Sequence, residues 1–390
     1  MTMLIRLLDY LSTVPNPSPS ATPASNQSTS SGTPFWATLL VGLVVALFGG
    51  AGAFAGAWRS AGALRRNTER TLEHERTRLL NERFSTAAEL LGHNEAACRL
   101  AGVHAMAGLA DDWTERRQTC IDVLCAYLRM PYAGLEKDAP EDAPASEHLN
   151  RRANHEVRLT AIRTIRDHLL PNALPESSWS GYDFDFTGAV FDGGDFSGVR
   201  FSGGHVSFSG AEFSGGVVDF SGAEFSSGDV SFVDAMFFSG RVEFGGADFS
   251  GGSMYFADAK FSGGEVLFGV KRSSDIYFAA KFSGSLVHFD RAEFTGSNVD
   301  FGGVRFSDGW VSFPCAKFSD GRVSFPRAKF SGATVKFQTA QFDGGVVDMQ
   351  DVATWSRPPS FDADVLTTPP AGLLLPDPTP KPLRERTGPA

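Results

Sequence analysis

The most regular hydrophobic pattern in this chain is a phenylalanine that returns at fixed steps between about residues 184 and 349. After three steps of five, the spacing alternates between seven and five, and mostly polar residues and glycines fill the gaps. The series before its one interruption is Phe186, Phe191, Phe196, Phe201, Phe208, Phe213, Phe220, Phe225, Phe232, Phe237, Phe244, Phe249, Phe256, Phe261 and Phe268. One core residue recurring in this way predicts a solenoid, in which each repeat packs on the next.

The local pattern explains how such a solenoid would wind. Ala or Val stands two residues before most of these Phe residues, so both side chains point to the same side of an extended strand. Ser-Gly or Gly-Gly follows, and glycine accepts the positive φ that a turn needs. We expect rungs about 4.8 Å apart. Each buried ring would stabilise the coil by roughly 2 to 3 kcal/mol.

Units such as Ala211 to Gly215 (Ala-Glu-Phe-Ser-Gly) and Val206 to Gly210 (Val-Ser-Phe-Ser-Gly) resemble the pentapeptide-repeat family. The order of segments resembles a membrane-anchored bacterial type with a helical domain before the repeats. The resemblance implies a right-handed quadrilateral β-helix over residues 182–349. Because this chain alternates five and seven where the family keeps fives, we favour coils of about 24 residues with two widened corners. A flatter coil of twelve residues is the alternative.

The phenylalanine register breaks once, over residues 270–281, where Ser273 stands in place of the expected Phe. We interpret the break as an insertion or deletion absorbed by a loop. A bulge that binds a partner is the alternative.

The run of residues 35–58 contains no charged side chain. At about 1.5 Å per residue, such a helix is long enough for a bilayer core of about 30 Å. Trp36 and Trp58 stand near its ends, where amphipathic rings prefer the interface. We therefore predict a transmembrane helix.

The orientation of this span follows from its flanks. Arginines follow it at once, at Arg59, Arg65, Arg66 and Arg70, whereas the preceding flank has only the distant Arg6. Positive charge favours the cytoplasmic side. We predict a single-pass protein of the cell membrane with the N-terminus outside and the C-terminal domains in the cytoplasm. Small residues of the span predict a homo-oligomer contact at Gly42, Gly49, Gly52 and Gly56, although glycine is also simply common in membrane spans.

The rest of the chain divides by composition into an α+β multidomain protein. Residues 1–34 are a Pro/Ser/Thr-rich tail predicted to be disordered, and 59–82 are a charged juxtamembrane helix. Residues 83–170 have helical periodicity, and two similar segments, 99–106 and 158–165, resemble HEAT or armadillo helices. Residues 350–390 are predicted to form a cap, with Trp355 and Phe361, and then a disordered proline-rich tail.

No catalytic, cofactor-binding or metal-binding residues are predicted. Cys98, Cys120, Cys125 and Cys315 lack the spacing of zinc ligands, and Cys120 and Cys125 are expected to be buried in a helix. His104 and His168 lie on helices without partners at ligand spacing. Nucleotide-binding, metalloprotease and hydrolase motifs are missing from the sequence. We predict that the protein is not an enzyme and needs no cofactor.

These observations favour a non-enzymatic, membrane-anchored scaffold that presents a cytoplasmic β-helix to an unknown protein partner. No nucleic-acid partner is expected. The alternative, implied by the family resemblance, is a DNA-mimicking modulator of a nucleic-acid enzyme such as a topoisomerase. The net charge is −10, and between Asp183 and Glu265 the acidic residues outnumber the basic ones, which are only Arg200, Arg241 and Lys260.

Overall fold

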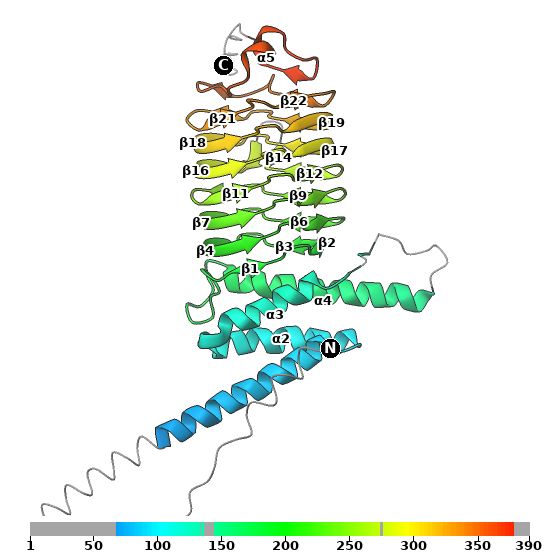
Figure 1. Cartoon of the computed structure of the whole chain (residues 1–390), viewed down its shortest axis with the longest axis vertical. Helices are drawn as coiled ribbons and strands as arrows, with labels where there is room; N and C mark the ends of the chain where they lie inside the picture. Colours follow the sequence, from blue (N-terminus) through cyan, green and yellow to red (C-terminus); the bar gives the residue numbers. More distant parts are fainter. Residues whose placement is uncertain (1–67, 133, 136–143, 274–275, 378–390) are drawn as a thin grey trace, which may run out of the picture. The chain divides into compact units, whose positions relative to one another are not determined.

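The computed structural model describes residues 68–132, 134–135, 144–273 and 276–377. In this part of the chain a small helical region comes first, and a parallel β-solenoid of about eight turns follows it (Figure 1). The expectation of helices followed by a β-helix with regularly spaced phenylalanine is confirmed.

The helical region contains helical residues 68–91, α2 (Ala96–Asp112), the 3-10 turn η2 (Thr114–Arg116), α3 (Arg117–Arg129) and α4 (Ala145–Leu169). α3 ends where Met130 becomes extended, with ψ 148°, as the residue before a proline prefers. α4 begins well before residue 153, where the apolar pattern starts. Its first two turns carry mainly exposed polar side chains, and such turns leave no amphipathic pattern in the sequence.

Most coils of the solenoid take 24 residues, so that Arg200 lies beside Glu224 and Lys317 beside Glu293. The first coil is two residues shorter, since Phe191 pairs with Phe213. Phe201 pairs with Phe225 in parallel register, and Phe318 pairs with Phe342 in the same way. Each coil contributes one segment to each of two parallel sheets, and four-residue turns join the segments. The longer of the two predicted coil lengths is confirmed, and the alternative of twelve is wrong.

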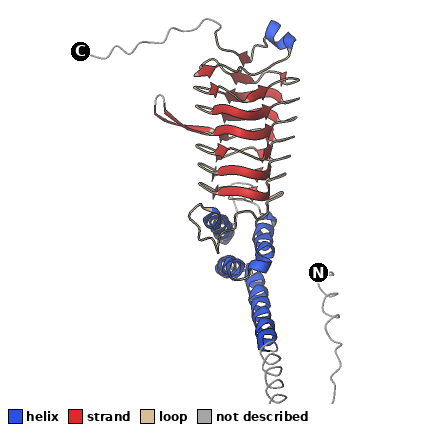
Figure 2. Ribbon diagram, turned by 90° about the vertical axis from the view of Figure 1, so that its left-hand side faces the viewer, coloured by secondary structure: helices blue, strands red, loops and turns tan. Residues whose placement is uncertain are grey.

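The strands are short and stack in one direction (Figure 2). One sheet contains β1 (Phe184–Asp185), β4 (Arg200–Ser207), β7 (Glu224–Ser231), β10 (Asp248–Phe249), β11 (Ser253–Tyr255), β16 (Lys281–His288), β18 (Arg305–Ser312), β20 (Lys329–Phe330), β21 (Thr334–Lys336) and β24 (Thr354–Trp355). The other contains β2 (Val190–Phe191), β3 (Gly194–Asp195), β5 (Glu212–Phe213), β6 (Val217–Asp219), β8 (Met236–Phe237), β9 (Arg241–Glu243), β12 (Lys260–Phe261), β13 (Glu265–Leu267), β17 (Glu293–Asp300), β19 (Lys317–Ser324), β22 (Gln341–Phe342), β23 (Val346–Asp348) and β25 (Leu373–Leu374).

Phenylalanine ladders fill the axis of the solenoid. The rings of Phe213 and Phe237 are stacked with centroids 4.6 Å apart, and those of Phe313 and Phe337 are 4.4 Å apart. The ladder side chains from Phe184 to Phe337 are buried, together with the Val and Ala residues that alternate with them. The predicted inward direction of the phenylalanines is therefore confirmed.

The turns between the sheets share one geometry. In Phe208–Ala211 the Ala211 N–H donates to the Phe208 carbonyl at 3.1 Å, and Gly210 has φ +62°. A turn with positive φ at its third residue favours glycine there. Several later turns nevertheless place another residue at this position, with φ between 56° and 63°: Asp234, Asp258, Arg291, Cys315, Arg327 and Thr339.

Both ends of the solenoid are covered. At the first coil, the Ile162 side chain of α4 packs against Gly194 of β3. At the last coils, Trp355 lies against Phe330 with centroids 5.3 Å apart, and Phe361 stacks on Phe337 at 5.2 Å. The short helix α5 (Ala363–Thr367) follows. Covering the ends protects strand edges and apolar rings that would otherwise face water.

Several predictions fall on residues that the structure does not describe. The proposed span 35–58, its glycines Gly42, Gly49, Gly52 and Gly56, and the tail 1–34 all lie outside the described residues. Among the helices that are described, none is both long enough and apolar enough to cross a bilayer.

Candidate interaction surfaces

The break in the phenylalanine register is an inserted β-hairpin. Its strands are β14 (Gly269–Ser273) and β15 (Ile276–Ala279), which pair antiparallel and project from the side of the solenoid (Figures 1 and 2). Phe249 pairs with Phe282, whereas a coil of regular length would bring position 273 opposite it, so the insertion adds nine residues. The Ala280 N–H still donates to the Phe268 carbonyl, at 2.7 Å, so the turn closes beneath the hairpin. The insertion is thus accommodated as paired strands rather than as an irregular loop.

Two aromatic side chains seat the hairpin on turns of neighbouring coils. A methyl group added at Gly246 would lie 2.2 Å from the Phe278 ring, and one added at Gly303 would lie 2.5 Å from the Cβ of Tyr277. Both glycines belong to Gly-Gly turns, Gly245-Gly246 and Gly302-Gly303. Glycine is required here because the hairpin occupies the space that a side chain would take.

The hairpin also lies near a carboxyl group. The Tyr277 ring and the Asp300 Oδ1 atom both lie within 3.0 Å of the point where Gly302 would carry a Cβ. Burial raises the pKa of Asp300 to about 6, although hydrogen bonds from the Gly302 N–H and from Ser324 oppose this shift. The Tyr277 side chain of the hairpin thus lies close to this buried carboxyl group.

A second polar cluster joins α4 to the first coil. The Asp192 carboxylate accepts hydrogen bonds from the Tyr132 hydroxyl at 2.8 Å and from the Leu135 N–H at 2.9 Å, and it lies 3.1 Å from the His155 Nδ1. Burial by itself would raise the pKa of Asp192, but the hydrogen bonds from His155, Tyr132 and Leu135 outweigh it and hold the pKa below its usual value.

A buried arginine extends this cluster. The buried Arg158 side chain lies 4.4 Å from the Tyr132 ring centroid and donates to the carbonyls of Leu128 and Val190. Burial, followed by the hydrogen bond to Asp192, raises the pKa of the Tyr132 hydroxyl. Each group is held by a neighbour within the protein, so the cluster fixes the helices to the solenoid.

A third cluster ties the ends of α2 and α4 together. Asp111 lies 3.1 Å from the His168 Nε2 and accepts a hydrogen bond from the Trp179 indole N–H at 3.1 Å. His168 also stacks on Trp179 with centroids 4.0 Å apart. His168 therefore has a packing role, while His104 is exposed.

The remaining candidate residues carry little chemistry. Cys120 and Cys125 are buried as predicted, and burial raises their thiol pKa values to about 11 and about 12. Cys98 is half-buried, and Cys315 is exposed in a turn. In the described ranges, no three His, Cys, Asp or Glu side chains are grouped so that they could hold a metal ion.

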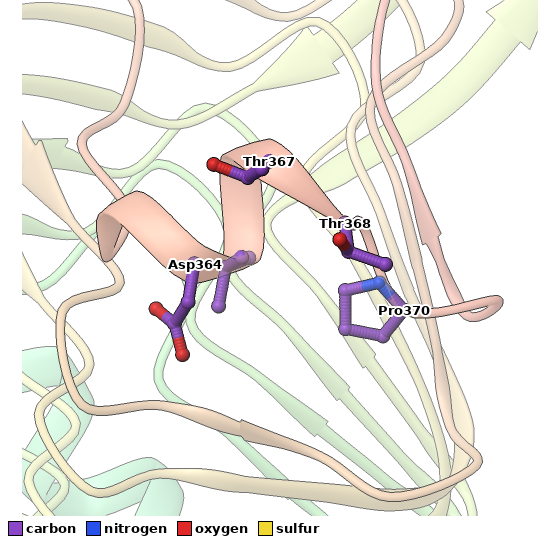
Figure 3. A pocket seen from close by; sticks show the side chains of 5 residues that line it. Asp364, Thr367, Thr368 and Pro370 are labelled. Carbon is purple, nitrogen blue, oxygen red and sulfur yellow. The ribbon is translucent and has the colours of Figure 1, made fainter.

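The described residues form small hollows on the surface. One of about 450 Å³ lies beside α5 and is lined by Asp364, Val365, Thr367, Thr368 and Pro370. Figure 3 shows the Asp364 carboxylate directed away from the threonines, so their polar groups do not converge on one point. Another, of about 290 Å³, includes His288, Trp310 and Lys336, and the Lys336 ammonium already covers the Trp310 ring at 4.1 Å.

No family model matches this chain, and no curated protein sequence matches it significantly. The parallel solenoid with regularly spaced phenylalanine is consistent with a pentapeptide-repeat β-helix.

Proposed function

We propose that this protein is a non-enzymatic, membrane-anchored scaffold of pentapeptide-repeat type, whose cytoplasmic β-helix binds a protein partner. The observation that carries the proposal is the hairpin β14–β15. It interrupts an otherwise regular coil, and its aromatic side chains pack against glycine turns of the two neighbouring coils. In a solenoid of this kind the phenylalanines fill the core, so the side chains on the outer faces are available to bind a partner.

The anchor in this proposal comes from the sequence alone. The uncharged run 35–58 and the arginines after it support a single span with the solenoid on the cytoplasmic side. Partners would accordingly be proteins of the cytoplasm or of the inner membrane face.

The test is cross-linking of the full chain in its native membrane, followed by identification of the attached proteins. The decisive variant deletes residues 270–278 and replaces Ala279 with Gly. This gives Phe-Gly-Gly-Ala, which is the sequence of the turn at Phe244–Ala247. We expect the variant to fold and to lose its specific cross-links. Identical cross-links with and without the hairpin would contradict the proposal.

A second proposal is imitation of DNA to modulate an enzyme such as a topoisomerase. It is favoured by the acidic residues of the early coils, but several of these are neutralised by ion pairs along the rod. Arg200 Nε lies 2.6 Å from Glu224, and Arg241 Nη2 lies 2.6 Å from Glu265. Inhibition of supercoiling by the purified chain would support this alternative, and an unchanged supercoiling rate would remove it.

A further inference from the structure

Three cations form a column on one sheet of the later coils. Lys281 of β16 pairs in register with Arg305 of β18, and Arg305 pairs with Lys329 of β20. All three side chains are exposed. Neighbouring rungs are about 4.8 Å apart, so the three positions extend over about 10 Å.

The members of this cationic column differ from five other basic residues of the solenoid. Arg200, Arg241, Arg291, Lys317 and Arg322 each have a carboxylate partner. Among the described residues, no carboxylate forms an ion pair with Lys281, Arg305 or Lys329. Like charges on directly opposed residues destabilise a sheet. The column therefore leaves positive charge that an external anion would neutralise.

Further cations stand beside the column. Arg327 lies in the turn two residues before Lys329, and it also has no carboxylate partner in the described part of the chain. The hairpin leaves the coil in the turn just before Lys281 and carries the exposed side chains of Lys271 and Arg272. Arg272 lies over the Phe278 ring at 4.5 Å.

The positive charge of the column stops at the neighbouring strands on both sides. In the same line of the same sheet, the two preceding strands carry Asp248 and Glu224, and the strand after Lys329 carries Thr354. A long polyanion laid along this line, such as duplex nucleic acid or a bilayer surface, would also meet Asp248 and Glu224. A short anionic segment avoids this repulsion.

We propose that the cationic column binds a short acidic peptide segment of a partner protein. At about 3.3 Å per residue, about three to four extended residues span the column. Arg305, at its centre, offers the planar fork that binds a carboxylate through two hydrogen bonds. This inference rests on the proposed scaffold function and names the chemistry of the partner.

The test uses the full chain in detergent micelles and fluorescein-labelled hexaglutamate as the probe. Binding is measured by fluorescence anisotropy at low and at physiological or higher salt, because exposed charge contacts weaken as salt screens them. We expect binding at low salt that falls at least tenfold in the variant Lys281→Gln, Arg305→Gln and Lys329→Gln. Circular dichroism should be unchanged, since all three side chains are exposed.

The matched control compares Arg305→Gln with Lys260→Gln. Lys260 is exposed and has no ion pair in the described structure, and it occupies the equivalent position, just before a ladder Phe, in the other sheet. We expect Arg305→Gln to weaken binding several-fold and Lys260→Gln to leave it within twofold. Equal losses, or no binding of hexaglutamate to the unmodified chain, would overturn the proposal.

Two further probes test whether nucleic acid or an anionic membrane binds better than an acidic peptide. Tighter binding of a twenty-residue oligothymidylate, or of nanodiscs containing phosphatidylserine, would contradict the peptide assignment in favour of phosphate-bearing partners. Failure here is distinct from failure of the scaffold function. Hairpin-dependent cross-links without hexaglutamate binding would leave the scaffold intact, whereas hexaglutamate binding without such cross-links would remove the scaffold.

Discussion

The coils before and after the hairpin share one core but differ on their outer surface. Phe232 and Phe313 are equally buried and stack on their neighbours at 4.8 Å and 4.6 Å. Outside, the earlier coils carry Glu224 and Asp248 in the line where the later coils carry Lys281, Arg305 and Lys329. The turns, by contrast, use glycine and other residues at the positive-φ position on both sides of the hairpin, as Gly222 and Asp234 before it and Gly303 and Arg327 after it show. The axis therefore imposes repetition, while the exterior is free to vary.

The largest effect should come from the shared core. We expect Phe232→Ala and Phe313→Ala to lower the free energy of unfolding by similar amounts, about 3 to 5 kcal/mol each, because both leave a cavity in the same ladder environment. Denaturant unfolding of the full chain in detergent measures this. Leu286→Ala is the control, since its side chain is 46% exposed and should cost far less. If the two substitutions lowered the free energy of unfolding by very different amounts, the cores before and after the hairpin would not be equivalent.

The next largest effect tests the contact between the hairpin and the turn at Gly246. Gly246 and Gly222 have nearly the same φ, +69° and +68°, but only Gly246 faces the Phe278 ring, and a Cβ at Gly222 would meet nothing within 4 Å. Gly222→Ala should cost about 1 kcal/mol from its φ alone. Gly246→Ala should cost about 3 kcal/mol, because overpacking adds to the same φ strain.

The hairpin deletion completes this comparison. In the chain lacking residues 270–278, with Ala279→Gly, the two alanine substitutions should cost the same free energy of unfolding. If Gly246→Ala still cost more than Gly222→Ala in the chain without the hairpin, Phe278 would not be the cause of the extra cost.

A smaller effect, on the order of 2 kcal/mol, concerns the pH dependence of stability. The pKa of Asp300 is raised to about 6 in the folded protein. Between about pH 4 and pH 6 the folded state therefore binds more protons than the unfolded state, so stability falls as pH rises through this window. Asp300→Asn should match the unmodified chain near pH 4 and exceed its stability near pH 7.5.

The same window tests whether the hairpin buries Asp300. In the hairpin deletion we expect the stability gained by Asp300→Asn at pH 7.5 to shrink, because the carboxylate becomes exposed to water. Denaturant unfolding at both pH values gives the comparison. A gain of unchanged size would show that other residues bury this carboxyl group.

The smallest effect concerns the turns of the later coils. Arg327 holds φ +60° with an exposed side chain. Arg327→Gly should relieve this conformation and raise the free energy of unfolding by about 0.5 to 1 kcal/mol, the reverse of Gly222→Ala. Thermal unfolding of the two variants measures the pair. A loss of stability in Arg327→Gly would show that its side chain contributes more than its backbone costs.

The sequence predicted the regular coils better than the insertion that interrupts them. The alternating spacing of five and seven predicted the solenoid, the inward phenylalanines and the length of the coil, because each depends on a periodic buried position. The insertion was recognised at residues 270–281, but not its pairing as a hairpin, since β14 and β15 have no periodic pattern of their own. A clue did exist in the Gly-Gly turns at Gly245-Gly246 and Gly302-Gly303, which stand out among turns that use a larger second residue.

The contacts between distant segments were not predictable in the same way. Nothing in the local sequence around His155 or Tyr132 points to Asp192, and these residues meet only because α4 lies on the first coil. Likewise, Lys281, Arg305 and Lys329 are isolated basic residues in the sequence. They become a column because coils of constant length, which follow the inserted hairpin, bring their strands into register.

The chain by itself determined the coil, because burying a phenylalanine at each step is a local and repeated source of stability. Only the tertiary structure decided which side chains of successive coils become neighbours. Register between strands depends on the exact length of every coil, and a surface charge acquires a neighbour only after that register is set.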